Sequence, residues 1–202
     1  MKDSKEISLY LDTATKALAV AMKCADKVKS YDLGNPKCAL ERTHLGIKLL
    51  CEDLACSMVD IDKYYCLLGP GSNTGIRLGL TIPRTIYALN PNIKLFGIPT
   101  MELLTMVAPV AALSDRNGNI FLAHKDEKGV TTYQRIDKKD IPSLKKEEAI
   151  VVEEKDTLAN EELASQNLIK VSVIDLMMKY ESAFKDFSSD EENYLPEYVL
   201  KI

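Results

Sequence analysis

The chain has 202 residues, of which 46% are hydrophobic and 28% charged, a composition typical of a globular protein that argues against extensive disorder. The longest apolar stretch, 101–113, is interrupted by Glu102, Thr105 and Pro109, and it is shorter than the roughly 20 residues that a membrane span needs. Residues 1–6 are charged rather than apolar, so we expect a cytoplasmic chain with no secretory signal and no membrane partner.

The charge of the chain bears on nucleic-acid binding. It has 26 basic and 30 acidic residues, which give a formal net charge of −4. A protein that holds nucleic acid by itself usually has a strongly basic surface, because it must neutralise phosphates. We therefore expect any contact of this chain with a nucleic acid to be indirect, through another subunit.

Expected elements follow from apolar runs and alternation bounded by turn residues. Strands are predicted at 7–13, 17–22, 28–34, 64–69, 94–98, 110–115, 119–125, 130–136 and 149–154. Helices are predicted at 40–58, at 74–89, in a short stretch that Pro99 opens, and at 172–187. Glycine-rich residues 69–75 form a turn between a strand and a helix, and residues 116–118 form a turn between two strands.

The order of these elements predicts an α/β fold of two related lobes. Three antiparallel strands are followed by helix, strand, helix and strand, and a second unit then opens with a hairpin. We place the first lobe at 1–109 and a smaller second lobe at 110–202.

Metal ligands and catalytic groups are not indicated by the sequence. The two histidines, His44 and His124, are far apart, so no H-E-x-x-H pattern can be written. The cysteines form no C-x-x-C pair, and we interpret them as small buried apolar side chains. They are Cys24, Cys38, Cys51, Cys56 and Cys66. Asp12 ends a strand, and without a second acid we interpret it as a turn residue.

The glycine-rich segment 69–77 has two interpretations. Its backbone N–H groups, at the start of a helix, could hold an anion. However, Ile76 stands where a phosphate-binding loop has lysine, and Thr74 stands where a dinucleotide-binding loop has its third glycine. We favour a structural turn in which Ser72 or Thr74 caps the helix.

Both long helices have two apolar stripes, although a helix on one sheet needs only one. In the first helix one stripe contains Leu40, His44, Ile47, Cys51, Leu54 and Met58, and the other contains Leu45, Leu49 and Cys56. In the second helix the stripes are Leu78, Ile82, Ile86 and Leu89, and Ile76, Leu80 and Tyr87. The surplus stripes predict either deep burial or a partner. In the first helix we expect the longer stripe to face the core and Leu45 and Leu49 to face outward.

Four segments resemble a known family. LYLDTATKALAVAM at 9–22, RTHLGIKLL at 42–50, GPGSNTGIRLG at 69–79 and PEYV at 196–199 are similar to the tRNA threonylcarbamoyladenosine biosynthesis protein TsaB family, also known as YeaZ. The resemblance covers residues 7 to about 125 and then the C-terminal tail.

The resemblance implies an actin-like ATPase fold with a reduced second lobe and without a catalytic site of its own. TsaB-type proteins bind the catalytic subunit TsaD and support threonylcarbamoyl transfer to the adenosine next to the anticodon of tRNA. TsaD needs a histidine pair on one helix, which this chain lacks. ATP and metal are therefore expected in TsaD and no cofactor in this chain, and a TsaE-type ATPase is a further expected partner.

The resemblance assigns the partner surface to the two helices of the first lobe, through which two copies of the chain could also pair. Expected partner-binding residues are His44, Leu45, Leu49, Cys56, Ile76, Leu80 and Tyr87. The family's glycine-rich motif consists of Gly69, Pro70, Gly71, Ser72, Thr74, Gly75 and Arg77. The alternative is an ATP-binding small-molecule kinase of the same fold.

Overall fold

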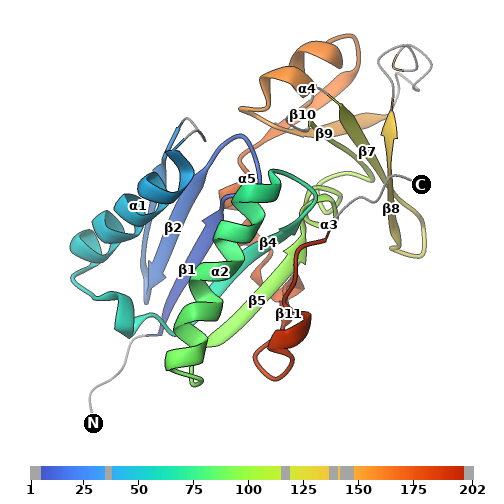
Figure 1. The fold of residues 1–202 in the computed structure, drawn as a ribbon. Coiled ribbons are helices and arrows are strands. Elements are labelled where there is room, and N and C mark those ends of the chain that lie inside the picture. Colours follow the sequence, from blue (N-terminus) through green and yellow to red (C-terminus); the bar gives the residue numbers. More distant parts are fainter. Residues whose placement is uncertain (1–5, 35–37, 115–118, 137–140, 142–147, 198–202) are drawn as a thin grey trace.

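Two β-sheets form the framework of the computed structural model, which describes residues 6–34, 38–114, 119–136, 141 and 148–197 (Figure 1). The first sheet has six strands in the order β11-β5-β4-β1-β2-β3, and the second has five in the order β10-β9-β6-β7-β8. Among the described residues, no helix combines the length and the apolar character of a membrane span.

The first sheet is built around β1. Its strands are β1 (Ile7–Asp12), β2 (Ala19–Cys24), β3 (Lys27–Asp32), β4 (Lys63–Gly69), β5 (Lys94–Pro99) and β11 (Lys185–Asp186). β1, β2 and β3 are joined as antiparallel neighbours, whereas β4 is parallel to β1 and β5 is parallel to β4. Every residue of β1 is buried, as expected for a strand that is covered on both faces.

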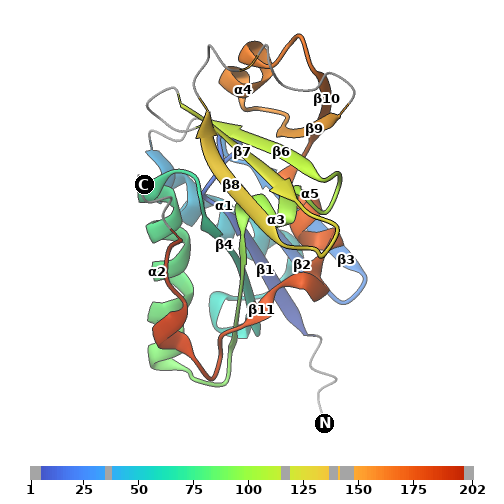
Figure 2. The same cartoon turned by 90° about the vertical axis from the view of Figure 1, so that its right-hand side faces the viewer.

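Helices cover both faces of this sheet. α1 (Ala39–Leu54) packs on β2 and β3, and α2 (Asn73–Leu89) packs on β4 and β5. Both lie on the same face of the sheet (Figure 1). The opposite face is covered by α5 (Val173–Lys179), which packs on β1 and β2, and by the chain that follows it (Figure 2). The short helix α3 (Thr100–Leu104) lies between β5 and the second sheet.

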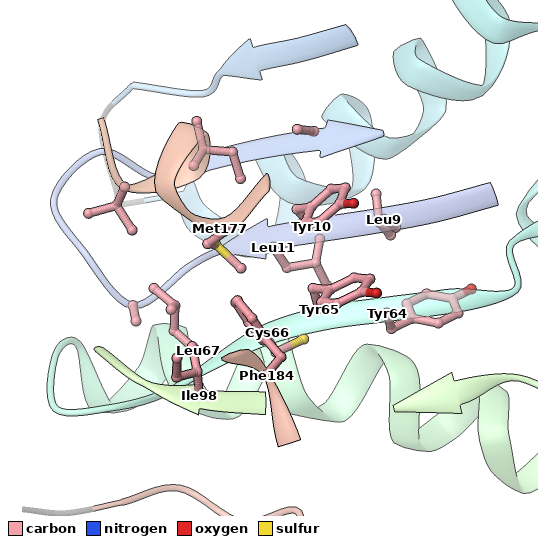
Figure 3. Close-up of a cluster of buried hydrophobic side chains, with 14 of the residues drawn as sticks. Leu9, Tyr10, Leu11, Tyr64, Tyr65, Cys66, Leu67, Ile98, Met177 and Phe184 are labelled. Atoms are coloured by element: carbon pink, nitrogen blue, oxygen red, sulfur yellow. The ribbon is translucent and has the colours of Figure 1, made fainter. Parts of the chain in front are cut away.

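The second sheet shares a core with the first. Its elements are β6 (Val110–Ser114), β7 (Ile120–Lys125), β8 (Thr131–Ile136), β9 (Ala149–Glu153), α4 (Thr157–Glu162) and β10 (Asn167–Val171). Ala111, Leu113, Ala123 and Val151 of this sheet belong to the same buried cluster as β1 and β4. Figure 3 shows part of that cluster, with Met177 and Phe184 of the C-terminal segment among side chains of β1 and β4.

An aromatic stack crosses the first sheet on the face that the C-terminal segment covers. The rings of Tyr10 and Tyr65 stack with centroids 4.8 Å apart, and those of Tyr65 and Phe96 stack with centroids 4.7 Å apart. Phe184 meets the Tyr65 ring edge-on at 5.3 Å. The hydroxyl of Tyr10 donates to Glu181, in a 3-10 helix (Glu181–Ala183). The segment after α5 is therefore part of the core of the first sheet.

Most predicted strands are confirmed, but the ends of two predicted helices needed correction and two elements were not predicted. The first helix ends at Leu54 rather than at residue 58, because Ala55 adopts a left-handed conformation and the N–H of Cys56 donates to the carbonyl of Cys51. The helix predicted over 172–187 ends at Lys179, and the chain then forms β11 beside β5. Helix α4 and strand β10 were not predicted.

Two predictions on the chain's organisation stay open. The turn predicted at 116–118 lies outside the described residues. The division into lobes of 1–109 and 110–202 remains a prediction. β11 comes late in the sequence but lies in the first sheet, so the two sheets do not divide the chain at one position.

Candidate functional site

The inner face of α1 is tightly packed on the first sheet. Its buried residues are Thr43, Gly46, Ile47, Leu50, Cys51 and Leu54. A Cβ atom on Gly46 would lie 2.8 Å from the side chain of Val20 and 2.7 Å from that of Leu33, so the glycine lets the helix approach β2 closely. The expected core positions Ile47, Cys51 and Leu54 are confirmed.

The outer face of α1 is a surface with exposed apolar side chains. Leu45 is 54% exposed and His44 is also exposed, while Leu49 is half-buried. Leu40, predicted in the core, is 61% exposed, which corrects that prediction. It lies in the first turn of the helix, and the buried face is centred on Ile47 and Leu50 rather than on the His44 side. We call Leu40, His44, Leu45 and Leu49 the α1 outer face.

Three predicted partner residues are not at the surface positions expected for them. Ile76 and Leu80 are 1% and 2% exposed and belong to the core. Both stripes of α2 are apolar, but the inner one also carries Gly75 and Gly79, which allow close approach to the β1–β2 turn. Cys56 lies beyond the end of α1, where its thiol contacts the Met22 sulfur at 3.6 Å.

The remaining residues of α2 are divided between two environments. Tyr87 is half-buried, and its hydroxyl donates to the carbonyl of Ser188 over 2.5 Å. Ile82 and Ile86 are partly buried against the core, whereas Leu89 at the end of the helix is 83% exposed. The apolar surface that α2 offers is therefore smaller than its second stripe predicts.

The glycine-rich turn is bonded to the chain's own β1–β2 turn. Ser72 caps α2, as predicted, because its hydroxyl accepts from the N–H of Gly75 over 3.2 Å. The N–H of Ser72 donates to the carbonyl of Ala14 at 2.7 Å, and the hydroxyl of Thr13 donates to the carbonyl of Gly75 at 2.7 Å. A Cβ atom on Gly75 would overlap the carbonyl oxygen of Thr13, so only glycine fits there.

These contacts decide what the motif can do. The N–H groups of Ser72 and Gly75, which an anion would need, are already used within the protein. Pro70 is buried, while Thr74 and Arg77 are exposed at the start of α2. Gly69 has a φ of +110°, which favours glycine, and lies against the main chain of Glu197. The geometry supports the structural interpretation of the motif.

Buried polar residues also lie where the two sheets meet. This sheet junction consists of Asp12, Thr15, Ser114, Glu153 and Asp156, all of them buried. Asp12 is a turn residue, as predicted: its carboxylate accepts from the Thr15 N–H at 3.0 Å and from the Thr15 hydroxyl at 2.5 Å. Burial raises the pKa of Asp12 to about 6.

The acids of the second sheet have different partners. Asp156 caps α4 by accepting from the Ala159 N–H at 3.2 Å, and it accepts from the N–H and hydroxyl of Ser114 at 2.7 Å and 2.5 Å. One oxygen of Glu153 accepts from the Lys155 N–H at 2.9 Å. Sequence reasoning missed both acids, because nothing in the spacing of the residues links them to Asp12. In the described part of the chain, no three His, Cys, Asp or Glu side chains are placed to hold a metal ion.

Comparisons with known proteins identify the class of fold first. YeaZ from Pseudomonas aeruginosa superposes with a TM-score of 0.68 at 15% sequence identity, over 96% of this chain and all of that one. A second structure, described as an uncharacterized protein with similarity to peptidase YEAZ from Pseudomonas aeruginosa, gives a TM-score of 0.66 at 16% identity over the same shares. The chain therefore has the actin-like ATPase fold of these proteins.

The sequence comparison is more specific. The chain is 27% identical to the tRNA threonylcarbamoyladenosine biosynthesis protein TsaB of Escherichia coli (strain K12) over 132 residues, or 60% of this chain. The match spans 57% of that relative's length. No family model matches the chain. The chain is thus similar in sequence to TsaB and in fold to the two YeaZ structures, in agreement with the resemblance of its motifs.

Proposed function

We propose that the chain takes part in tRNA threonylcarbamoyladenosine biosynthesis as a non-catalytic subunit that binds TsaD. The role in this modification pathway is suggested by the similarity to the TsaB protein of Escherichia coli. The assignment of a partner-binding role is suggested by the α1 outer face, and this face is the observation on which the proposal depends.

The α1 outer face has the character of a contact surface. Leu40 and Leu45 are both more than half exposed and flank His44 within two turns of one helix. Leu45 and Leu49 are one turn apart on the same side of the helix, whereas Leu40 lies about 140° around the helix axis from Leu45. Burying a leucine side chain contributes about 1.5–3 kcal/mol, so a partner that covers Leu45 and Leu49 would gain binding free energy.

The glycine-rich turn supports a non-catalytic role over the alternative, a small-molecule kinase. A kinase of this fold would need free N–H groups around the phosphates of ATP. Here the N–H of Ser72 is bonded to Ala14 and that of Gly75 to the Ser72 side chain. Nucleotide binding by the isolated chain would separate the two functions.

The proposal also covers the other components of the complex: the tRNA, the ATP and metal, and the further protein partners. With a net charge of −4, the chain is expected to reach tRNA through TsaD rather than by its own surface. ATP and metal are assigned to TsaD, and a TsaE-type ATPase is a further proposed partner. A homodimer through the same helices is expected to compete with TsaD.

The experiment that tests this function reconstitutes the modification. The chain is co-purified with TsaD, and threonylcarbamoyladenosine formation on tRNA is then measured with and without the chain. We expect a stable complex, modification that depends on the chain, and no ATP turnover by the chain alone. Turnover of ATP by the isolated chain that is lost in Asp12→Asn or Ser72→Ala would contradict the non-catalytic role.

A further inference from the structure

Glu153 occupies an unusual place at the sheet junction. It is the last residue of β9, and its exposed fraction is 0%. β9 pairs with β6, whose last residue, Ser114, is bonded to Asp156 at the start of α4. Glu153 therefore lies at the end of the second sheet, close enough to Asp12 at the end of β1 for the two carboxyl groups to interact electrostatically.

Only half of the Glu153 carboxyl group has a partner within the described part of the chain. One oxygen, Oε2, accepts from the N–H of Lys155, whereas Oε1 is buried and has no hydrogen-bond partner among the described residues. Leaving a charged oxygen buried without a donor is costly, and proteins usually avoid this by pairing the charge or by neutralising it.

The charged groups that the structure describes around Glu153 do not neutralise it. Asp12 faces it from β1, Asp156 from the start of α4, and Glu154 follows it in the chain. The ammonium group of the neighbouring Lys155 bonds to Asp32 at the end of β3 instead. Burial, reinforced by repulsion from Asp12 and Asp156, raises the pKa of Glu153 to about 7.

We propose that Glu153 is a proton-controlled latch between the two sheets: its neutral carboxyl group stabilises the sheet junction, and its ionisation loosens it. A neutral carboxyl group can stay buried beside Asp12 and can donate through its own O–H. An ionised one repels Asp12 and Asp156 and must gain access to water. The Lys155–Asp32 bond joins the two sheets two residues further on, so movement of Glu153 acts directly on that link.

The direction of the pH effect follows from the raised pKa. In the unfolded chain Glu153 ionises near its ordinary value of 4.5, but in the folded chain it ionises near 7. Its contribution to stability is therefore complete below about pH 4.5 and is lost as the pH rises through 7. Between pH 6 and pH 8 the equilibrium constant for unfolding should rise about tenfold through this group alone.

The test compares the full chain with two variants, Glu153→Gln and the matched control Glu154→Gln, which changes the exposed neighbour. Urea unfolding is measured at pH 6, 7 and 8 at constant ionic strength. Hydrogen-exchange protection factors are measured for β9 and, as an internal reference, for β4. In the unmodified chain and in Glu154→Gln, we expect unfolding to become about tenfold more favourable and β9 to lose protection relative to β4. In Glu153→Gln most of this pH dependence should be absent.

Three results would overturn the proposal. The first is equal pH dependence in Glu153→Gln and the unmodified chain, and the second is no loss of β9 protection between pH 6 and 8. The third is full restoration of β9 protection at pH 8 by Mg²⁺ or Ca²⁺, since a cation and not a proton would then neutralise the carboxyl group. If Glu153→Gln does not fold, carboxyl-¹³C NMR of the unmodified chain decides the matter: a glutamate that titrates near pH 7 is expected, and its absence refutes the latch.

Discussion

Gly69 lies directly against Glu197, although 128 positions separate them in the sequence. A Cβ atom on Gly69 would be 2.5 Å from the carbonyl oxygen of Glu197, and the N–H of Glu197 donates to the carbonyl of Leu68 at 2.7 Å. The glycine-rich turn and the start of the PEYV segment are thus one structural unit, which the sequence shows only as two separate motifs.

Replacing Gly69 should therefore destabilise the protein for two reasons. Gly69→Ala would adopt a strained φ of +110° and would also press against the main chain of Glu197. We expect a loss of about 2–3 kcal/mol in the free energy of unfolding, measured with urea. Gly129→Ala is the control, because Gly129 has a φ of +82° but its added Cβ atom would make only an ordinary contact, at 3.9 Å, with the Lys125 side chain. The control should lose only about 1–2 kcal/mol, and equal losses would show that the contact with Glu197 contributes nothing.

Tyr194 anchors the same segment. It is fully buried, and its hydroxyl donates to the carbonyl of Phe96 at 3.1 Å. Tyr194→Phe should cost about 1 kcal/mol through the lost hydrogen bond, and Tyr194→Ala about 3–5 kcal/mol through the cavity it leaves. Thermal unfolding provides the measurement. Tyr31→Phe, which removes an exposed hydrogen bond to Asp53, is expected to change stability by less than about 0.5 kcal/mol. A comparable effect of the Tyr31 and Tyr194 hydroxyls would contradict the prediction.

The α1 outer face can be tested by introducing a glutamate at two equally exposed apolar positions, one on this face and one elsewhere. Leu45→Glu should fold with a stability change within about 0.5 kcal/mol but should weaken TsaD binding by about 2–5 kcal/mol, because a carboxylate would be buried at the interface. Val130→Glu is the control: Val130 is 55% exposed, much like Leu45 at 54%, but lies between β7 and β8. Binding is measured by calorimetry and folding by thermal melting.

A core substitution completes this test. Ile47→Glu, on the buried side of the same helix, is expected to unfold the chain, since Ile47 is 1% exposed. If Leu45→Glu and Val130→Glu bind TsaD equally well, the α1 outer face is not the interface. Loss of folding in Leu45→Glu would mean that the side chain is part of the core.

Asp12 should give a measurable pH effect of its own. Burial raises its pKa from an ordinary value of 3.8 to about 6, so its favourable contribution is complete below about pH 3.8 and is lost as the pH rises through 6. Asp12→Asn cannot ionise. Its stability relative to the unmodified chain should therefore improve by about 2 kcal/mol between pH 4 and pH 6, measured by urea unfolding. A difference that is the same at both pH values would show that Asp12 does not titrate in this range.

Local patterns were enough to predict the framework of the fold. The alternating, β-rich sequence of β1, the glycines before α2 and the order of strands and helices each have a local physical cause. The helix ends were harder. α1 stops at Leu54 because Ala55 takes a left-handed conformation, and an alanine gives no sequence signal for that.

The candidate surface was only partly predictable. The two stripes of α2 are similarly apolar, so periodicity could not show that Ile76 and Leu80 face the core. The decisive contact is between Gly75 and Thr13, two residues from different elements whose approach is visible only in the fold. Glu153 was missed for the same reason, since its chemistry depends on Asp12 and on burial rather than on its neighbours in the chain.

The return of the C-terminal segment to the first sheet has a consequence for how the protein is made. The aromatic stack of Tyr10 and Tyr65 stays open on one side until Phe184 arrives, and β5 lacks its outer neighbour until β11 forms. On the ribosome, the first strands to emerge must therefore wait for nearly the whole chain before their core is closed. During translation this exposed aromatic face is the part of the nascent chain that most needs protection from aggregation.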